Sequence, residues 1–230
     1  SGLANLPQLL SCETSLPRIF DNGYSGICLR WFFTLAPLGA SFRRRTKGKG
    51  EGEIIERRFK QQIMNIIFIG YRGTGKSTVA KIVGQRLGRT VVSTDAEIVR
   101  ETGQSIPEIV EQLGWDHFRE LETQMCQKLQ AQTDLVIDTG GGLILKDENV
   151  KILKANGKLF WLTAEVPTIV GRIGGDTQRP SLSGTKSFVE EIEEILQIRI
   201  PHYKAAADFT IPTDQETPDA LADQILTYFS

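Results

Sequence analysis

A nine-residue segment, Gly70-Tyr71-Arg72-Gly73-Thr74-Gly75-Lys76-Ser77-Thr78, constrains this chain more than any other feature. It follows an apolar run at residues 66–69 and leads into a helical pattern that begins near residue 76. Buried strand, glycine-rich loop and helix, in that order, are the context in which such a segment forms a phosphate-binding P-loop. Its glycines let successive N–H groups turn toward phosphate oxygens, and the start of the helix adds the positive end of its dipole. We therefore expect the chain to bind a nucleoside triphosphate.

The side chains of this segment have different expected tasks. Lys76 supplies an ammonium group for the β- and γ-phosphates, and the hydroxyl of Ser77 is a ligand of the kind that Mg²⁺ accepts. The residues expected to bind the nucleotide here are Gly73, Thr74, Gly75, Lys76, Ser77 and Thr78.

Composition is compatible with an enzyme of this kind. The chain has 230 residues, 40% of them apolar, which suffices for one domain with a sizeable core. A formal net charge of -1 gives no basic field for nucleic acid. The three cysteines, Cys12, Cys28 and Cys126, have neither metal-ligand spacing nor the pattern of a disulfide framework, so a reducing cytoplasm is expected. The longest apolar run before the P-loop, residues 31–40, is well short of the ~20 residues that span a bilayer, and no membrane segment is expected.

The chain divides at Met64, its first methionine. Residues 1–63 hold 10 Lys/Arg and 5 Asp/Glu, a net charge of +5, whereas residues 64–230 carry -6. The first part shows no sustained helical or strand period. We interpret it as an upstream extension that is disordered or not native to the protein; a transit peptide is the alternative, because Ser and Arg are present and acids are few. The functional domain is expected at residues 64–230.

From Met64 onward, strand-like and helical patterns alternate. Strands are expected at residues 66–69, 90–92, 135–137, 158–162 and 209–211. Helices are expected at residues 76–87, 96–101, 106–113, 115–131, 146–155, 166–173, 187–206 and 218–229. This alternation predicts an α/β fold of three layers, with a five-stranded parallel sheet covered on both faces. Ligands bind outside the carboxyl ends of such strands, which places Gly70, residues 93–95 and residues 138–142 around one crevice.

Five segments after the P-loop narrow the interpretation further. They are Ser93-Thr94-Asp95, Phe118-Arg119-Glu120-Leu121-Glu122, Asp138-Thr139-Gly140-Gly141-Gly142, Gln178-Arg179-Pro180 and Arg199-Ile200-Pro201-His202-Tyr203. In this order and spacing they resemble the shikimate kinase family over essentially all of residues 64–230. The resemblance implies a P-loop kinase fold with a mobile lid. It also implies ATP and Mg²⁺ as cofactors and phosphorylation of the 3-hydroxyl of shikimate.

The resemblance also implies roles for the acceptor-site residues. Arg119 and Arg199 would clamp the carboxylate of shikimate, a task that suits the planar guanidinium group, with Glu122 orienting Arg119. Asp95 would orient the acceptor hydroxyl and take up its proton as the phosphoryl group is transferred. The alternative for Asp95 is a cap on the following helix. The backbone at Gly140, Gly141 and Gly142 would come close to the substrate ring.

Residues 174–186 are polar and rich in Gly and Ser, and the resemblance makes them a lid that excludes water. Arg179 on this lid would stabilise charge on the transferring phosphoryl group. Arg172, at its base, would stack on the adenine. Either arginine has an ordinary surface charge as its alternative.

Two positions depart from the family pattern. The family usually has an acid two residues before the position of Asp95, where it helps to hold Mg²⁺ through water, and this chain has Ser93. Asp138 ends an apolar strand pattern, and we hypothesise that it replaces the missing acid, so that Ser77 and Asp138 form the metal site. The second departure, Ser181 after Arg179-Pro180, is expected to affect the packing of the lid.

Two other functions remain open at this point. One is a kinase for a different small hydroxylated acceptor, such as gluconate or a nucleoside monophosphate. The other is a regulatory or interaction module that binds nucleotide without turnover, for which Ser93 is the support. A monomer is expected, because no apolar surface stripe appears in the pattern.

Overall fold

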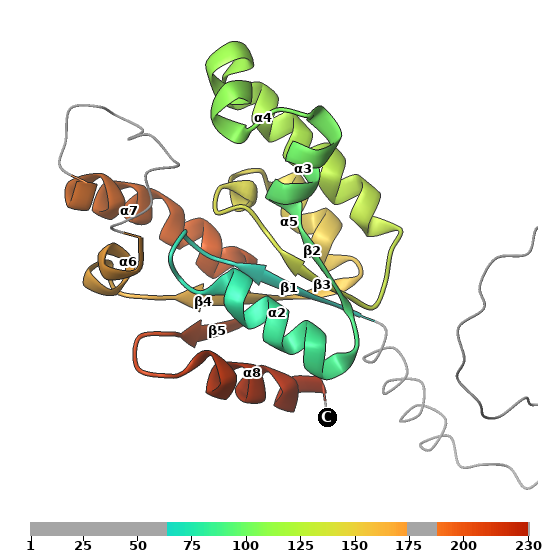
Figure 1. Ribbon diagram of the computed structural model, residues 1–230, viewed down its shortest axis with the longest axis vertical. Coiled ribbons are helices and arrows are strands. Elements are labelled where there is room, and N and C mark those ends of the chain that lie inside the picture. The colour runs from blue at the N-terminus through green and yellow to red at the C-terminus, as the bar shows by residue number, and fades with distance from the viewer. Residues whose placement is uncertain (1–63, 174–187, 230) are drawn as a thin grey trace, which may run out of the picture. The chain divides into compact units, whose positions relative to one another are not determined.

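The computed structural model describes residues 64–173 and 188–229, in which strands and helices alternate along the chain (Figure 1). The strands are β1 (Asn65–Ile69), β2 (Thr90–Ser93), β3 (Leu135–Asp138), β4 (Gly157–Thr163) and β5 (Phe209–Pro212). The helices are α2 (Lys76–Leu87), α3 (Thr94–Thr102), α4 (Ile106–Gln130), α5 (Asp147–Lys154), α6 (Val166–Ile173), α7 (Phe188–Ala206) and α8 (Pro218–Leu226), with 3₁₀ turns η1 (Leu143–Leu145) and η2 (Thr227–Phe229). The predicted extension at residues 1–63 and the predicted lid at residues 174–186 lie outside the described residues. None of the described helices is long and apolar enough to cross a membrane.

All five strands run parallel, in the order β2-β3-β1-β4-β5. The P-loop strand β1 lies at the centre, between β3 and β4. The register pairs Asp138 with Phe68 on one side and with Ser93 on the other. The carboxyl ends of β1, β2 and β3 therefore meet at one edge of the sheet, as the sequence predicted.

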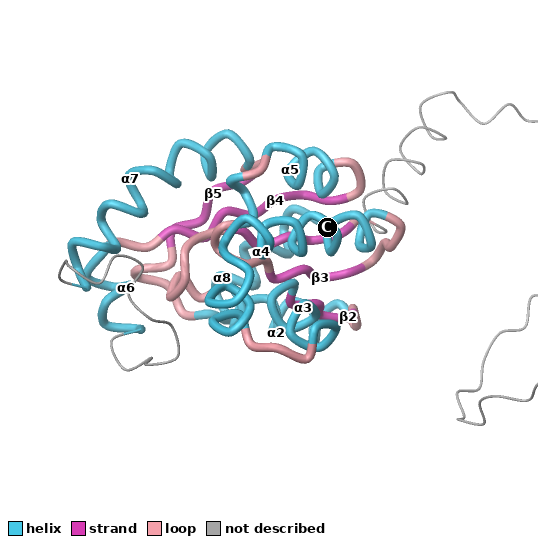
Figure 2. Tube along the Cα trace, turned by 90° about the horizontal axis from the view of Figure 1, so that it is seen from above, coloured by secondary structure: helices cyan, strands magenta, loops and turns pink. Residues whose placement is uncertain are grey.

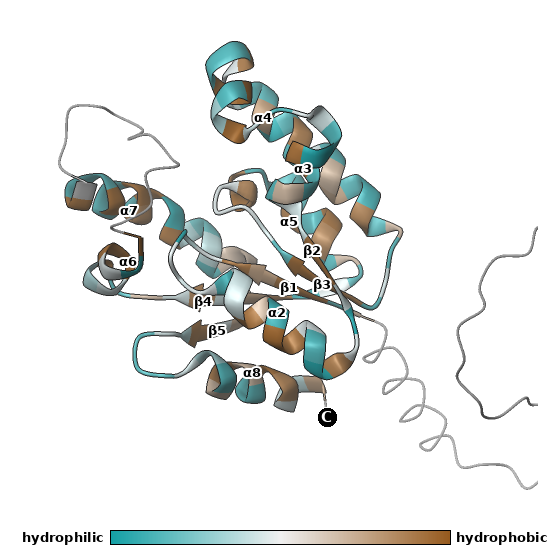
Figure 3. Cartoon of the chain, viewed as in Figure 1, coloured by the Kyte–Doolittle hydropathy of each residue, from teal (hydrophilic) through white to brown (hydrophobic). Residues whose placement is uncertain are grey.

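The side chains of the sheet alternate between two buried faces, because successive residues of a strand point to opposite sides. Ile66 and Phe68 pack with residues of α2 and α8. Ile67 and Ile69 pack with residues of α4, α5 and α7. Seen from above, the strands lie between α2 and α8 on one side and α5 and α7 on the other (Figure 2). Hydropathy follows these layers, because the strands are apolar and the helices carry both apolar and polar residues (Figure 3). The predicted three-layer α/β fold with a five-stranded parallel sheet is confirmed.

The helix boundaries differ clearly from the prediction at two places, and the other helix ends shift by at most two residues. The two helices expected at residues 106–113 and 115–131 form one element, α4, which Gly114 interrupts with a φ of 81°. This dihedral angle is easy for glycine and rare for other residues, so the glycine makes a kink where the pattern indicated a break. The last helix ends at Leu226 rather than at residue 229, since its final turn tightens into η2.

Candidate active site

The P-loop joins β1 to α2 and has the curled backbone that its glycines predicted. Gly73 and Gly75 have φ values of 79° and 89°, in the left-handed region that favours glycine. A Cβ on Gly73 would lie 2.7 Å from Cγ2 of Ile173, so a larger residue would also collide with α6. Gly75 is the N-cap of α2, and no acidic residue lies in the first turn of that helix. The positive end of the helix dipole is thus open to an anion.

Lys76 and Ser77 point to different partners at the start of α2. The Nζ atom of Lys76 is largely buried and donates a hydrogen bond of 3.0 Å to the carbonyl oxygen of Tyr71. The Oγ atom of Ser77 donates to Oδ2 of Asp138, 2.5 Å away at the end of β3. Burial raises the pKa of Asp138 above that of an ordinary aspartate, and Lys76 and the hydrogen bond from Ser77 partly offset this effect. Ser77 and Asp138 therefore form a pair at the phosphate end of the loop.

Ser93 has a structural task that sequence reasoning missed. It is the N-cap of α3, where its Oγ atom accepts a hydrogen bond from the backbone N–H of Ala96 at 3.4 Å. The alternative that Asp95 caps this helix is therefore wrong. Asp95 instead lies in the first turn of α3, and its Oδ1 atom would be 2.4 Å from a Cβ on Gly140.

The glycine-rich segment after β3 makes room for protein side chains. A Cβ on Gly142 would lie 2.3 Å from a terminal nitrogen of Arg119, and one on Gly140 would be 3.0 Å from Oε1 of Glu122. The resemblance implies that the backbone of these glycines comes close to the substrate ring. The described contacts give a second reason for glycine at these positions, because Asp95 and Arg119 pack directly against the glycine backbone.

Arg119 and Arg199 reach the same pocket from α4 and α7, but their surroundings differ. Arg119 is ion-paired to Glu122 one turn later in α4. Glu122 is fully buried, and burial raises its pKa although Arg119 opposes this shift. Arg199 donates a hydrogen bond of 3.2 Å to the carbonyl oxygen of Gly141.

Two pockets adjoin at the carboxyl edge of the sheet. One, of about 370 Å³, is lined by the acceptor-site residues Arg119, Glu122 and Arg199, by the three glycines after β3, and by apolar side chains of α4. The other, of about 650 Å³, is lined by the P-loop together with Asp138, Arg172 and Thr213. The two pockets share part of their lining. The shared residues are Arg72, Asp95, Gly140 and Gly141. Two ligands bound side by side would thus meet at Asp95.

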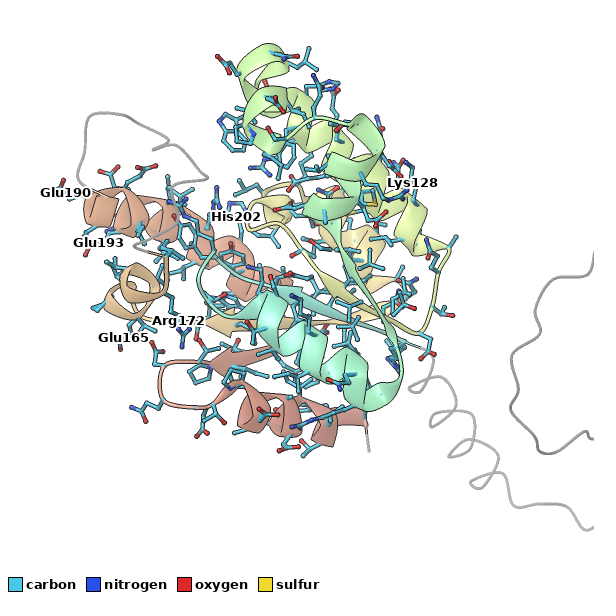
Figure 4. All side chains as sticks on the ribbon, in the orientation of Figure 1. Lys128, Glu165, Arg172, Glu190, Glu193 and His202 are labelled. Carbon is cyan, nitrogen blue, oxygen red and sulfur yellow. The ribbon has the colours of Figure 1, made fainter. Side chains whose placement is uncertain are left out.

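Arg172 is more than an ordinary surface charge. It lies near the end of α6 (Figure 4) and donates hydrogen bonds to Oγ1 and to the carbonyl oxygen of Thr213, at 2.9 and 2.6 Å. A longer bond of 3.3 Å reaches the carbonyl oxygen of Gly73 in the P-loop. The arginine therefore links α6, the segment after β5 and the P-loop at the wall of the larger pocket. Arg179, the other predicted nucleotide ligand, lies outside the described residues.

Four residues that sequence reasoning did not assign belong to these pockets or support them. Tyr71 and Arg72 occupy P-loop positions at which the motif fixes no residue type, so nothing in the pattern indicates where they point. Thr213 holds Arg172 from the loop after β5. Tyr203 was visible as part of the Arg199 motif, but its hydrogen bond to Gly141 depends on the packing of α7.

Comparison with known proteins identifies the family. The family model described as shikimate kinase matches residues 72–230. A shikimate kinase of Caldicellulosiruptor bescii is 38% identical over 164 residues, which cover 71% of this chain and 94% of that protein. One of Thermodesulfovibrio yellowstonii is 41% identical over 162 residues, covering 70% and 92%. A solved shikimate kinase of Acinetobacter baumannii in complex with shikimate is 34% identical, with a TM-score of 0.69 over 74% of this chain and 95% of that one. The predicted ATP- and Mg²⁺-dependent phosphorylation of shikimate is thereby confirmed, and the chain belongs to the shikimate kinase family.

Proposed function

We propose that the residues of the two adjoining pockets transfer the γ-phosphoryl group of ATP to the 3-hydroxyl of shikimate. The observation that carries this proposal is that Asp95 lines both pockets. A hydroxyl held at Asp95 from the acceptor side would face the phosphate end of the P-loop. Phosphoryl transfer needs little covalent chemistry from the protein, so this alignment and the neutralisation of charge are its main contributions.

On the nucleotide side, the proposed ligands are Gly73, Thr74, Gly75, Lys76, Ser77 and Thr78. All of them line the larger pocket at the start of α2. When ATP binds, Lys76 would exchange the carbonyl of Tyr71 for phosphate oxygens, because a charge-assisted hydrogen bond is stronger than one to a neutral carbonyl. Arg172, held by Thr213, would face the adenine.

Ser77 and Asp138 fit a magnesium ion. Hydroxyl and carboxylate oxygens are hard donors of the type that Mg²⁺ prefers, and these two lie 2.5 Å apart. Within residues 64–173 and 188–229, no group of three or more His, Cys, Asp or Glu side chains could hold a metal alone. The proposed site therefore depends on phosphate oxygens and water for its other ligands, as is usual for Mg²⁺ with nucleotides. Bound there, the ion would neutralise charge on the β- and γ-phosphates.

The acceptor side is proposed to recognise a carboxylate that carries hydroxyl groups. Arg119 and Arg199 both line the smaller pocket and can present two guanidinium groups to one carboxylate. Asp95, at the junction, would accept a hydrogen bond from the reacting hydroxyl and take up its proton. Arg179 stays a prediction for the transition state, since the lid lies outside the described residues.

Turnover with a panel of acceptors tests this assignment. The full chain is supplied with ATP and Mg²⁺, and ADP formation is followed with shikimate, gluconate or a nucleoside monophosphate as the acceptor. Of the three acceptors, we expect only shikimate to give rapid turnover, because two arginines facing one small pocket favour a compact carboxylate. Faster turnover with a nucleotide or with gluconate would contradict the assignment. ATP binding without turnover on any acceptor would favour the alternative of a binding module.

We also propose that the protein works as a cytoplasmic monomer. In support, Cys126 is a buried free thiol, which suits a reducing compartment. The large apolar side chains that are exposed in the described residues are divided among α4, α7 and η2. Sedimentation of the full chain at several concentrations tests the proposal, and a mass that rises with concentration would contradict it.

A further inference from the structure

Tyr71 belongs to the P-loop by sequence and to the acceptor pocket by position. It is the second residue of the loop, where the motif fixes no residue type, and it lines the smaller pocket. Only 3% of its surface is exposed. Its side chain packs against Ile169 and Ile173 of α6 and against Ile192 of α7. The ring is thus packed against α6 and α7.

The ring of Tyr71 faces the guanidinium group of Arg199. The central carbon of that group lies 5.9 Å from the ring centroid, within the range of a cation–π interaction. Arg199 also donates a hydrogen bond of 3.2 Å to the carbonyl oxygen of Gly141, and its side chain interacts with the hydroxyl of Tyr203. Arg199 is therefore held between an aromatic ring and a backbone carbonyl, both of which are uncharged.

The surroundings of Arg199 differ from those of Arg119. Arg119 is ion-paired to Glu122. Among the described residues, no carboxylate lies within ion-pairing distance of Arg199. An ion pair would fix the guanidinium group but would also compete for it with the carboxylate of a ligand. Neutral contacts fix its place without a direct ion pair to a described carboxylate.

The carbonyl that holds Arg199 is itself held from α7. The hydroxyl of Tyr203 donates to the carbonyl oxygen of Gly141 at 2.5 Å. Tyr203 is 1% exposed, and its ring stacks on Trp161 with centroids 5.7 Å apart. Burial raises the pKa of its hydroxyl well above the ordinary value for tyrosine, so the group remains a hydrogen-bond donor. Tyr203 thereby fixes the peptide that Arg199 contacts.

We propose that Tyr71 and Tyr203 are positioning residues for Arg199, and that together they aim its guanidinium group at the carboxylate of the acceptor. The inference rests on the proposed function, since it names the groups that orient one of its substrate ligands. It also gives the second residue of this P-loop a task in acceptor recognition rather than in nucleotide binding.

Steady-state kinetics of single variants of the full chain test the inference. Tyr71→Leu removes the ring face, and we expect the KM for shikimate to rise roughly 3- to 30-fold, the range of a partly buried cation–π contact. Tyr71→Phe keeps that face and should stay within about two-fold of the unmodified chain. Tyr203→Phe removes one hydroxyl and should raise the same KM roughly 3- to 10-fold. In all three variants the KM for ATP should change by less than about two-fold, because these changes weaken binding of the acceptor and not of the nucleotide.

A change at an aromatic cluster away from both pockets controls for general loss of stability. Tyr228 in η2 packs against Phe160 and Phe209 and lines neither pocket. Tyr228→Leu should lower the temperature of unfolding without moving the KM for shikimate. An unchanged KM for shikimate in Tyr71→Leu, or a Tyr71→Phe variant as impaired as Tyr71→Leu, would overturn the inference.

The same variants separate this inference from the proposed function. If the unmodified chain shows no turnover that depends on shikimate, the proposed function fails. Shikimate binding then decides the inference, and it can be followed by the fluorescence of Trp115, which lines the acceptor pocket. Equally tight binding by Tyr71→Leu and the unmodified chain would refute the positioning role.

Discussion

Asp138→Asn is the sharpest test of the hypothesis that Asp138 replaces the acid expected two residues before Asp95. Asp138 is 7% exposed, and its Oδ2 atom accepts the hydrogen bond from Ser77 at 2.5 Å. Asparagine has nearly the same shape as aspartate, so the substitution removes the charge and little else. Because Asp138 and Ser77 together form the proposed Mg²⁺ site, the loss should weaken binding of the ion rather than binding of the acceptor.

The magnitude follows from the kind of contact. Removing a group that orients a metal ligand typically lowers metal affinity 10- to 100-fold. We therefore expect the Mg²⁺ concentration for half-maximal rate to rise by about that factor in Asp138→Asn. Asp138 does not line the acceptor pocket, so the KM for shikimate should stay within about two-fold.

The assay is the initial rate of ADP formation against Mg²⁺ concentration, with ATP fixed and shikimate saturating. Asp134→Asn is the matched control, since Asp134 precedes β3, is largely exposed and pairs with Arg89 away from both pockets. Each substitution removes one negative charge at an end of β3, Asp134 just before the strand and Asp138 at its last residue. A Mg²⁺ titration of Asp138→Asn that superimposes on that of Asp134→Asn would refute the reasoning.

A second substitution should restore the metal requirement. Ser93 lies opposite Asp138 in the register of β2 and β3. Aspartate caps helices as well as serine does, so Ser93→Asp should preserve the start of α3. In the Asp138→Asn background it would return an acid to the family's usual position, and we expect it to recover most of the lost Mg²⁺ affinity. A double variant no better than Asp138→Asn would show that the two positions are not interchangeable.

Three further outcomes are expected. Gly142→Ala should raise the KM for shikimate at least about 10-fold, because the φ of Gly142 is an ordinary -105° while its Cβ would lie 2.3 Å from Arg119; an unchanged KM in a kinetic assay would contradict this. Burial raises the pKa of Glu122, so its contribution to stability is complete below its ordinary pKa of 4.5 and is lost as pH rises through the higher native value. Urea unfolding between pH 4 and 7 should show this decline in the unmodified chain, whereas Glu122→Gln should lack it. Burial raises the pKa of the Cys126 thiol to about 12, so peptide mapping after alkylation at pH 8 should find it modified only in unfolded protein.

The sequence predicted the layers of this fold because each strand is a short apolar run and several helices carry a start or stop signal. Ser105 and Glu108 form a capping box at the start of α4, and Gly88 ends α2 in the left-handed conformation. The kink at Gly114 was visible as a break in the helical pattern. Whether the two halves continue as one element depends on how they pack, which the local pattern does not contain.

The candidate site was predictable where a motif fixes both the residue and its place in the fold. Lys76, Ser77 and Asp95 follow strand ends, and the carboxyl ends of parallel strands meet at one edge. The pairing of Ser93 with Asp138 needs the register of β2 and β3, which the local sequence of two short parallel strands does not specify. Tyr71 and Arg72 were missed because the P-loop motif leaves their positions open, and only the folded loop turns them toward the acceptor.

The most direct test of the central claim is ADP formation by the full chain with ATP and Mg²⁺, measured with and without shikimate, together with the identity of the product. We expect turnover that depends on shikimate, one ADP for each shikimate consumed, and phosphorus attached to the 3-oxygen in the NMR spectrum of the product. ATP hydrolysis that shikimate does not accelerate, or phosphate on a different oxygen, would contradict the proposed alignment at Asp95.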